Sequence, residues 1–192
     1  MFSKNKPINL LALTPCCVDY YPQINRSFVG GNSLNVASMW RKLEPDSNIS
    51  VITCLGNDEN GKRIKDFLYK CEIDTSRVYL EEGKTATNKL RVDGYGERFG
   101  IEGARQGGVY EDFVLSDDDW DFVAKQDIVA MPANNPNFSL MTRKKHPDQL
   151  LAVDYLDVEN SLQMEKTIEF SDIAFIAARS DLLPAYRKLA LK

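Results

Sequence analysis

The residues best suited to chemistry are short polar side chains gathered near the start of the chain. Asp19 follows the first apolar run, and Asn32 and Asn35 follow the glycine pair Gly30 and Gly31. A carboxylate and two amides can hydrogen-bond the hydroxyls of a polyol, and adjacent glycines let backbone N–H groups approach a ligand closely through positive φ. Gly-Gly-Asn is also ordinary turn chemistry, so this stretch alone leaves a binding site and a plain turn both open.

An amphipathic helix is predicted over residues 33–43, directly after the glycine pair. Val36, Met39, Trp40 and Leu43 fall at positions i, i+3, i+4 and i+7, which predicts that these four side chains form its buried face. The glycine turn would therefore lead into a helix N-terminus, where unpaired N–H groups and the positive dipole end favour electron-rich ligands.

A second group of candidate residues lies on a predicted β-hairpin. Residues 86–92 alternate between two faces, Asp93-Gly94-Tyr95-Gly96 is a hairpin turn, and residues 97–101 would form the returning strand. Arg98 and Phe99 lie on that strand, where an aromatic ring could cover the apolar face of a sugar. A hairpin of this kind predicts a flap beside the main sheet.

The positions of these residues depend on a repeated strand–turn–helix pattern. Buried strands are predicted at residues 8–13, 49–55, 128–131, 150–153 and 173–177. Helices are predicted from the spacing of Ile64, Phe67, Leu68 and Cys71 and from the capping residues Ser116 and Ser180. This pattern predicts an α/β fold with a mostly parallel sheet flanked by helices.

One loop has the Gly-x4-Gly-Lys spacing of a phosphate-binding loop, from Gly56 to Lys62. Arg63 stands where such a loop needs a hydroxyl for Mg²⁺, and Asp58 and Glu59 would repel phosphates from inside it. A tight turn with Asp58 as a helix cap is the favoured interpretation. An unrelated Rossmann-like nucleotide-binding protein is kept as an alternative function.

The composition of the chain limits which binding partners and which cellular compartment are expected. The chain has 192 residues and a net charge of −4, which gives no indication of a nucleic-acid or membrane partner. Its four cysteines show no Cys-x-x-Cys spacing, its single histidine lies in a polar loop, and no group of side chains has metal-ligand spacing. The first apolar run is too short for a signal or a membrane span, so a cytoplasmic protein is expected.

Two stretches resemble a known family. Cys17-Val18-Asp19-Tyr20-Tyr21-Pro22-Gln23, followed by residues 28–37 with their Gly-Gly-Asn-x-x-Asn pattern, is similar to the N-terminal signature of the ribokinase-like (PfkB) carbohydrate kinases. Within that family the chain looks most like kinases that act on fructoselysine and related fructosamines. The resemblance implies a three-layer α/β/α ribokinase-like fold in which the hairpin flap is a lid over the sugar.

The resemblance also implies roles for individual residues. Asp19, Gly30, Gly31, Asn32 and Asn35 would hold the sugar hydroxyls, and the lid would pair two chains in a homodimer. ATP and Mg²⁺ would be the cofactors, and the product would be a sugar 6-phosphate. The family's Asn-x-x-Glu motif is replaced by Ala-Arg-Ser-Asp, so only its last position, Asp181, keeps a carboxylate for the cofactor.

The sequence departs from the family at its end. These kinases carry a Gly-Ala-Gly-Asp turn whose aspartate is the catalytic base, and no glycine follows Gly108 here. The base aspartate is therefore expected to lie beyond Lys192, and no catalytic residue is assigned within the chain.

The chain is accordingly expected to be C-terminally truncated. Residues 1–192 would be the N-terminal portion of one kinase domain, with lid segments at about 17–29 and 85–102. It would carry mainly the sugar-binding half and be inactive alone. A non-catalytic sugar-binding or dimerisation module is a further alternative.

Overall fold

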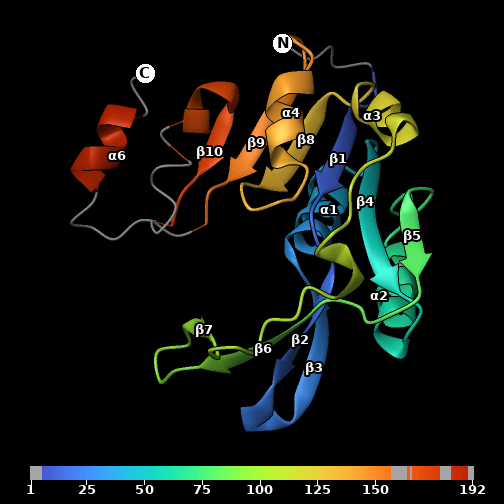
Figure 1. Cartoon of the computed structure of the whole chain (residues 1–192), viewed down its shortest axis with the longest axis vertical. Helices are drawn as coiled ribbons and strands as arrows, with labels where there is room; N and C mark the ends of the chain where they lie inside the picture. The colour runs from blue at the N-terminus through green and yellow to red at the C-terminus, as the bar shows by residue number, and fades with distance from the viewer. Residues whose placement is uncertain (1–5, 157–163, 165, 178–182, 190–192) are drawn as a thin grey trace.

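The predicted α/β fold is confirmed. The computed structural model describes residues 6–156, 164, 166–177 and 183–189. Its main sheet has six strands in the order β10-β9-β8-β1-β4-β5, and all neighbouring strands are parallel (Figure 1). The strands are β1 (Asn9–Leu13), β4 (Asn48–Gly56), β5 (Val78–Glu81), β8 (Ile128–Pro132), β9 (Leu150–Asp154) and β10 (Ile173–Phe175).

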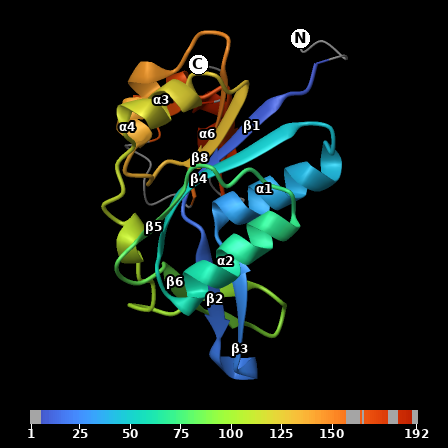
Figure 2. The same cartoon turned by 90° about the vertical axis from the view of Figure 1, so that its right-hand side faces the viewer.

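Helices cover both faces of this sheet. Figure 2 shows α1 (Asn32–Leu43) and α2 (Glu59–Lys70) on one side, and α3 (Asp117–Val123) and α4 (Phe138–Lys144) on the other. The side chains of β1 point alternately to the two faces of the sheet and so belong to two core clusters. Leu10 and Ala12 pack with α1 and α2, whereas Leu11 and Leu13 pack in the cluster that contains α3 and α4. The sheet therefore forms the middle of three layers.

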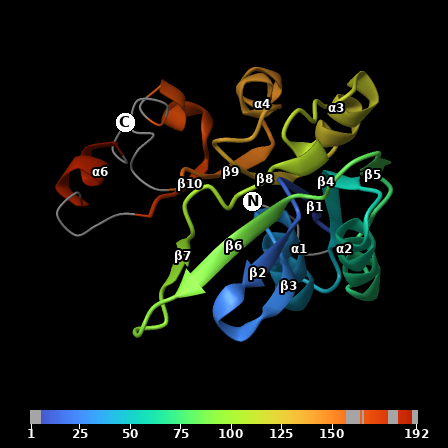
Figure 3. The ribbon, with the colours of Figure 1, turned by 60° about the horizontal axis from the view of Figure 1, so that its bottom comes forward.

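A second, smaller sheet projects from the main one (Figure 3). It has four strands in the order β3-β2-β6-β7: β2 (Cys17–Tyr21), β3 (Arg26–Gly30), β6 (Thr87–Val92) and β7 (Arg98–Gly100). The predicted hairpin is present as β6 and β7, and its turn is closed by the Asp93 carbonyl, which accepts from the Gly96 N–H at 3.2 Å. The small sheet contains more than that hairpin, because β2 pairs in parallel with β6.

The predicted buried face of α1 is wrong in part. Met39 and Leu43 are 51% and 66% exposed. Val36 and Trp40 are partly buried, and the fully buried residues of the helix are Ser33, Leu34 and Ala37. On this buried face, the Ser33 hydroxyl donates to the Thr14 carbonyl at 2.7 Å, which links the first turn of the helix to the end of β1.

Two predicted helix caps are confirmed. The Asp58 side chain accepts from the Gly61 N–H at 3.0 Å at the start of α2. At the start of α3, Ser116 and Asp119 form a reciprocal capping box. The cap predicted at Ser180 lies outside the described residues, and the helix after it, α6, is described as Leu183–Leu189. Strand β5 and helix α4 were not predicted.

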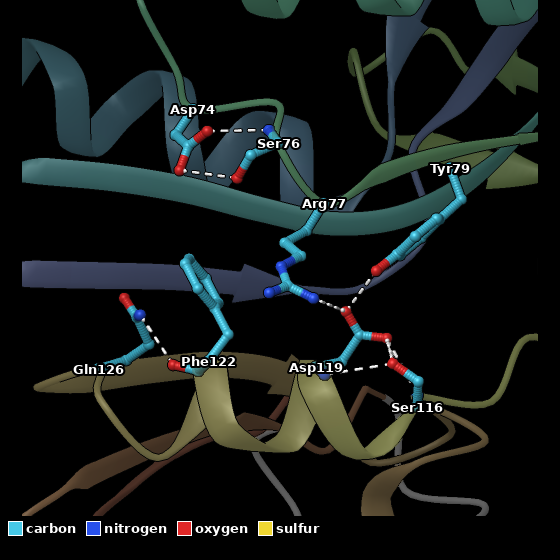
Figure 4. A network of polar contacts seen from close by, with 8 residues as sticks. All are labelled: Asp74, Ser76, Arg77, Tyr79, Ser116, Asp119, Phe122 and Gln126. Atoms are coloured by element: carbon cyan, nitrogen blue, oxygen red, sulfur yellow. Dashed lines mark hydrogen bonds and ion pairs between the residues drawn. The ribbon is translucent and has the colours of Figure 1, made fainter.

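The α3 cap belongs to a wider polar network (Figure 4). The buried Asp119 carboxylate also accepts from the Tyr79 hydroxyl at 2.5 Å and pairs with Arg77 at 3.1 Å, which joins α3 to β5 and the loop before it. Burial opposes ionisation of Asp119, but the hydrogen bonds from Tyr79 and Ser116 outweigh it and hold the pKa of this carboxyl below its usual range. None of the helices in the described ranges is both long and apolar enough to cross a membrane.

Candidate functional site

Two adjoining cavities lie at the carboxyl edge of the main sheet. Strand order reverses direction at β1, because β4 and β5 follow on one side of it and β8 to β10 on the other. Open α/β sheets bind ligands at such a switch point, outside the carboxyl ends of the strands. The larger cavity, about 460 Å³, is lined by Thr14, by the ends of β8, β9 and β10, and by the first turn of α1.

The smaller cavity, about 270 Å³, lies where the two sheets meet. Its wall includes Gly31 at the start of α1, Asn88 on β6, and Arg105 and Glu111 from the connection that follows β7. Asn32 and Pro132 line both cavities. The first turn of α1 is therefore the boundary between two hollows.

Gly31 is required at this boundary by its backbone. Its φ of 95° and ψ of 152° fall in a region that only glycine adopts readily. A Cβ added at this position would lie 2.4 Å from the Pro15 carbonyl oxygen. The expectation of positive φ is thus met at Gly31, whereas Gly30 has no positive φ. Gly30 leaves space instead, since a Cβ there would lie 2.6 Å from Asp19 Oδ2.

The two asparagines of α1 have different surroundings. Asn32 Nδ2 donates to Asp154 Oδ2 at 3.2 Å, which joins the start of α1 to the end of β9. Asn35 is exposed and lines the larger cavity only. The helix N-terminus is partly used within the protein, because the Ser33 N–H donates to Thr14 Oγ1 at 3.2 Å.

Asp19 lies on β2 and lines neither of these two cavities. It is next to the smaller one, because its Oδ1 accepts from Asn88 Nδ2 at 3.0 Å and from Cys17 Sγ at 3.4 Å. Cys17 and Asn88 both line that cavity. The structure therefore groups Asp19 with Gly30 and with two residues that were not predicted, and it places Asn35 in the other hollow.

The lid candidates are further away. Arg98 and Phe99 are exposed on β7 and line neither cavity, and the Arg91 guanidinium covers the Phe99 ring 5.5 Å from its centre. The predicted contact of Arg98 and Phe99 with a sugar stays a prediction.

Most residues of the smaller cavity were missed by sequence reasoning, among them Arg105, Glu111 and Asn88. Only Asn88 gave a signal, as an amide among the apolar residues of an alternating strand. Arg105 and Glu111 come from a segment whose residue types indicate nothing beyond a polar connection.

Two predictions concern the end of the chain and fall outside the described residues. Asp181, the predicted cofactor residue, is not among them, and neither is Lys192, beyond which the catalytic base is expected. The described ranges therefore contain no counterpart of either feature, and both stay predictions.

The loop from Gly56 to Lys62 does not present a phosphate cradle. Asp58 occupies it, accepting from the backbone N–H groups of Gly61 and Thr85 and from the Thr85 hydroxyl at 2.6 Å. The interpretation of this loop as a capped turn is confirmed. Among the described residues, no group of three or more His, Cys, Asp or Glu side chains could hold a metal ion. The Mg²⁺ that the resemblance implies stays a prediction.

Comparison with known proteins finds similarity to carbohydrate kinases. Residues 16–178 match the pfkB family carbohydrate kinases. The chain is 30% identical over 164 residues to fructoselysine 6-kinase of Escherichia coli and 26% identical over 124 residues to a fructosamine kinase of Bacillus subtilis. These matches cover 84% and 64% of this chain, but only 60% and 43% of the relatives, so the chain spans at most about three fifths of their length.

Solved structures give the same fold. A sugar kinase from Pyrococcus horikoshii, in complex with ATP, superimposes with a TM-score of 0.68 at 21% identity, over 86% of this chain and 62% of that one. Ribokinase from Thermotoga maritima superimposes with a TM-score of 0.65 at 17% identity, over 88% and 59%. The ribokinase-like fold is therefore shown, and the match over residues 16–178 shows that this chain belongs to the pfkB family of carbohydrate kinases.

Proposed function

We propose that this chain is the sugar-binding part of an ATP-dependent kinase that phosphorylates the 6-hydroxyl of a ketoamine sugar. The observation that carries the proposal is that the two cavities meet at Asn32. This meeting point lies at the switch point of a parallel sheet, where α/β proteins bind ligands, and the chain belongs to a family of carbohydrate kinases. Gly31 and Asn32 would hold sugar hydroxyls, with Asp19 behind the smaller cavity and Asn35 in the larger one.

The ketoamine class is supported by two observations. The curated relatives quoted above are named for fructoselysine and fructosamine. In addition, Arg105 and Glu111 line the smaller cavity, and neither forms an ion pair with another described residue. A sugar that carries a lysine has both ammonium and carboxylate groups, so an acid and a guanidinium in one wall suit it better than they suit a neutral ketose.

Phosphoryl transfer requires precise positioning of the reacting groups and stabilisation of charge on the transferred group. The Gly-Ala-Gly-Asp turn implied by the family resemblance has no counterpart in the 192 residues, because no glycine follows Gly108. We therefore infer that the chain by itself binds sugar without turnover. The small sheet is proposed as the lid and as the surface that pairs two chains, with Arg98 and Phe99 on its outer hairpin.

ATP would supply the phosphoryl group, and no catalytic step is assigned to Mg²⁺ because the described residues offer no cluster of ligands for it. All four cysteines are free thiols. That state suits the reducing cytoplasm, which is where we propose the protein works.

Isothermal titration with fructoselysine and with ATP tests the proposal. We expect measurable fructoselysine binding, a loss of about tenfold in affinity in Asn32→Ala, and no 6-phosphate product by mass spectrometry. Asn48→Ala is the matched control, because Asn48 lies at the amino edge of the sheet and lines neither of the two cavities.

Turnover by the purified chain would overturn the inference of inactivity. An absence of sugar binding would remove the proposed function. Sugar binding without any ATP binding would favour a non-catalytic sugar-binding module.

A further inference from the structure

The cluster of Cys17, Asp19 and Asn88 has no role in the function proposed above beyond that of Asp19. Cys17 and Asp19 are two residues apart on β2 and so point to the same face of the small sheet. Asn88 on β6 is the direct register partner of Asp19 in the parallel pairing. Strand pairing therefore brings a thiol, a carboxylate and an amide together, although Asn88 is distant in sequence.

The two oxygens of Asp19 are used differently. Oδ1 accepts from both Asn88 Nδ2 and Cys17 Sγ, at 3.0 Å and 3.4 Å. Oδ2 accepts no hydrogen bond from the described residues, and it lies over Gly30, where the missing Cβ leaves room for it. A carboxylate whose one oxygen is held by two donors has a fixed orientation, and its other oxygen keeps its acceptor capacity because no described residue donates to it.

Cys17 acts in this cluster as a neutral donor. Burial, followed by the negative charge of Asp19, raises the pKa of the Cys17 thiol far above its ordinary value. The thiol therefore stays protonated and donates a hydrogen bond to Asp19, while its sulfur accepts a hydrogen bond from Asn88 Nδ2 at 3.2 Å. The amide nitrogen of Asn88 faces the carboxylate because its oxygen would be repelled there.

Asn88 connects this cluster to the smaller cavity. Its amide nitrogen is engaged by Asp19 and Cys17, its side chain lines the cavity, and its amide oxygen makes no hydrogen bond to a described residue. An amide held in this way presents an acceptor to the hollow, and sugar hydroxyls are donors to such a group.

We propose that Cys17 and Asn88 are positioning residues that aim Asp19 Oδ2 at a sugar hydroxyl, and that the Asn88 side-chain oxygen accepts a second hydroxyl of the same sugar. The inference rests on the proposed function for the identity of the ligand. The orientation of Asp19 does not depend on it, since the hydrogen bonds are present in the chain without ligand.

The experiment compares Asn88→Ala, Cys17→Ala and Cys17→Ser in two measurements on the whole chain: the crystallographic orientation of the Asp19 carboxylate without sugar, and fructoselysine affinity by titration. We expect the two alanine variants to release Asp19 from its orientation and to lose about tenfold or more in affinity. Cys17→Ser keeps a donor, so it should retain both properties to within about threefold.

Lys89→Ala is the matched control, because Lys89 is the next residue of β6, is exposed, and points to the opposite face. An unchanged Asp19 orientation in both alanine variants would overturn the proposal. So would unchanged affinity, or a Cys17→Ser variant no better than Cys17→Ala. If the wild-type chain binds no sugar, the proposed function fails, and the sugar-free crystal structures still decide the positioning role.

Discussion

Two neighbouring glycines serve different purposes at the edge of the smaller cavity. Gly31 is needed for its backbone conformation, with φ of 95°, and Gly30 is needed for the space it leaves beside the Asp19 carboxylate. Glycine is the only residue that satisfies either condition without strain at its site. The glycine pair therefore determines both the start of α1 and the position of Asp19, the candidate sugar-binding residue on β2.

Gly31→Ala is expected to destabilise the fold by about 2–4 kcal/mol, from the disfavoured backbone region and from the close approach of the new Cβ to the Pro15 carbonyl. Urea unfolding followed by circular dichroism measures this difference. Gly94→Ala is the control, because a Cβ at Gly94 meets nothing within 4 Å. Equal stability of the two variants would contradict the backbone requirement at Gly31.

Arg105→Ala is expected to weaken fructoselysine binding by about tenfold and to leave fructose binding unchanged, because only fructoselysine carries a carboxylate, on its lysine part, for the guanidinium. Titration with the two sugars measures the contrast. Arg98→Ala is the comparison, since Arg98 lines neither cavity. A larger effect at Arg98 than at Arg105 would favour the hairpin arginine that the sequence suggested.

At the scale of single residues, sequence reasoning grouped the candidate site residues that are close together along the chain, and their binding roles stay predictions. Asp19, Gly31 and Asn32 lie within a short stretch, and their residue types indicated hydrogen bonding to a polyol. Asn88 and Arg105 come from a later segment, and their proximity depends on the parallel pairing of β2 with β6. Periodicity predicts that a strand exists but not which strand it will pair with, so these two residues could not be placed.

At the scale of elements, acidic caps tie helices to distant strands. Asp58 caps α2 and also holds Thr85, just before β6, so one side chain joins a main-sheet helix to the small sheet. Asp119 does the same between α3 and β5. In both cases burial opposes ionisation, the hydrogen bonds outweigh it, and the pKa of the carboxyl is lowered.

The lowered pKa values of these carboxyl groups determine how stability depends on pH. A carboxyl with a lower pKa in the folded chain contributes its stability above its unfolded pKa, near 3.8, and loses it as pH falls through the folded value. We expect the free energy of unfolding to fall below about pH 4, and Asp119→Asn to reduce that pH dependence while costing about 2 kcal/mol at pH 7. Thermal unfolding at pH 7 and at pH 3 measures both effects.

Asp118→Asn is the control, because Asp118 is exposed in the same turn of α3. If the free energy of unfolding falls as steeply at low pH in Asp119→Asn as in the wild type, Asp119 is not responsible for this pH dependence.

The order of elements could be predicted because strands and helices here alternate with clear apolar periods. The orientation of α1 could not. Met39 and Leu43 fit the helical spacing but are exposed, and the face that meets the sheet contains Ser33, Leu34 and Ala37. Apolar spacing therefore predicts that a helix forms, but not which of its overlapping faces packs on the sheet.

At the scale of the whole molecule, the chain consists of two sheets that meet at the candidate site. The main sheet holds the core, whereas the small sheet exposes large apolar side chains, with Phe28 46% and Phe99 43% exposed. The outer strand of the main sheet, β10, also exposes Ile173 and Phe175. Each surface is a candidate for self-association, and the proposed lid dimer requires the first.

Phe28→Glu is expected to convert a dimer to monomer, because it places a charge within an apolar surface whose burial contributes about 1.5–3 kcal/mol per large side chain. Sedimentation velocity over a range of protein concentrations measures the change. Ile173→Lys is the matched variant on the other surface and should leave the dimer intact, because β10 belongs to the main sheet. If Ile173→Lys disrupts the dimer and Phe28→Glu does not, chains associate through the main-sheet edge and the small sheet remains a lid only.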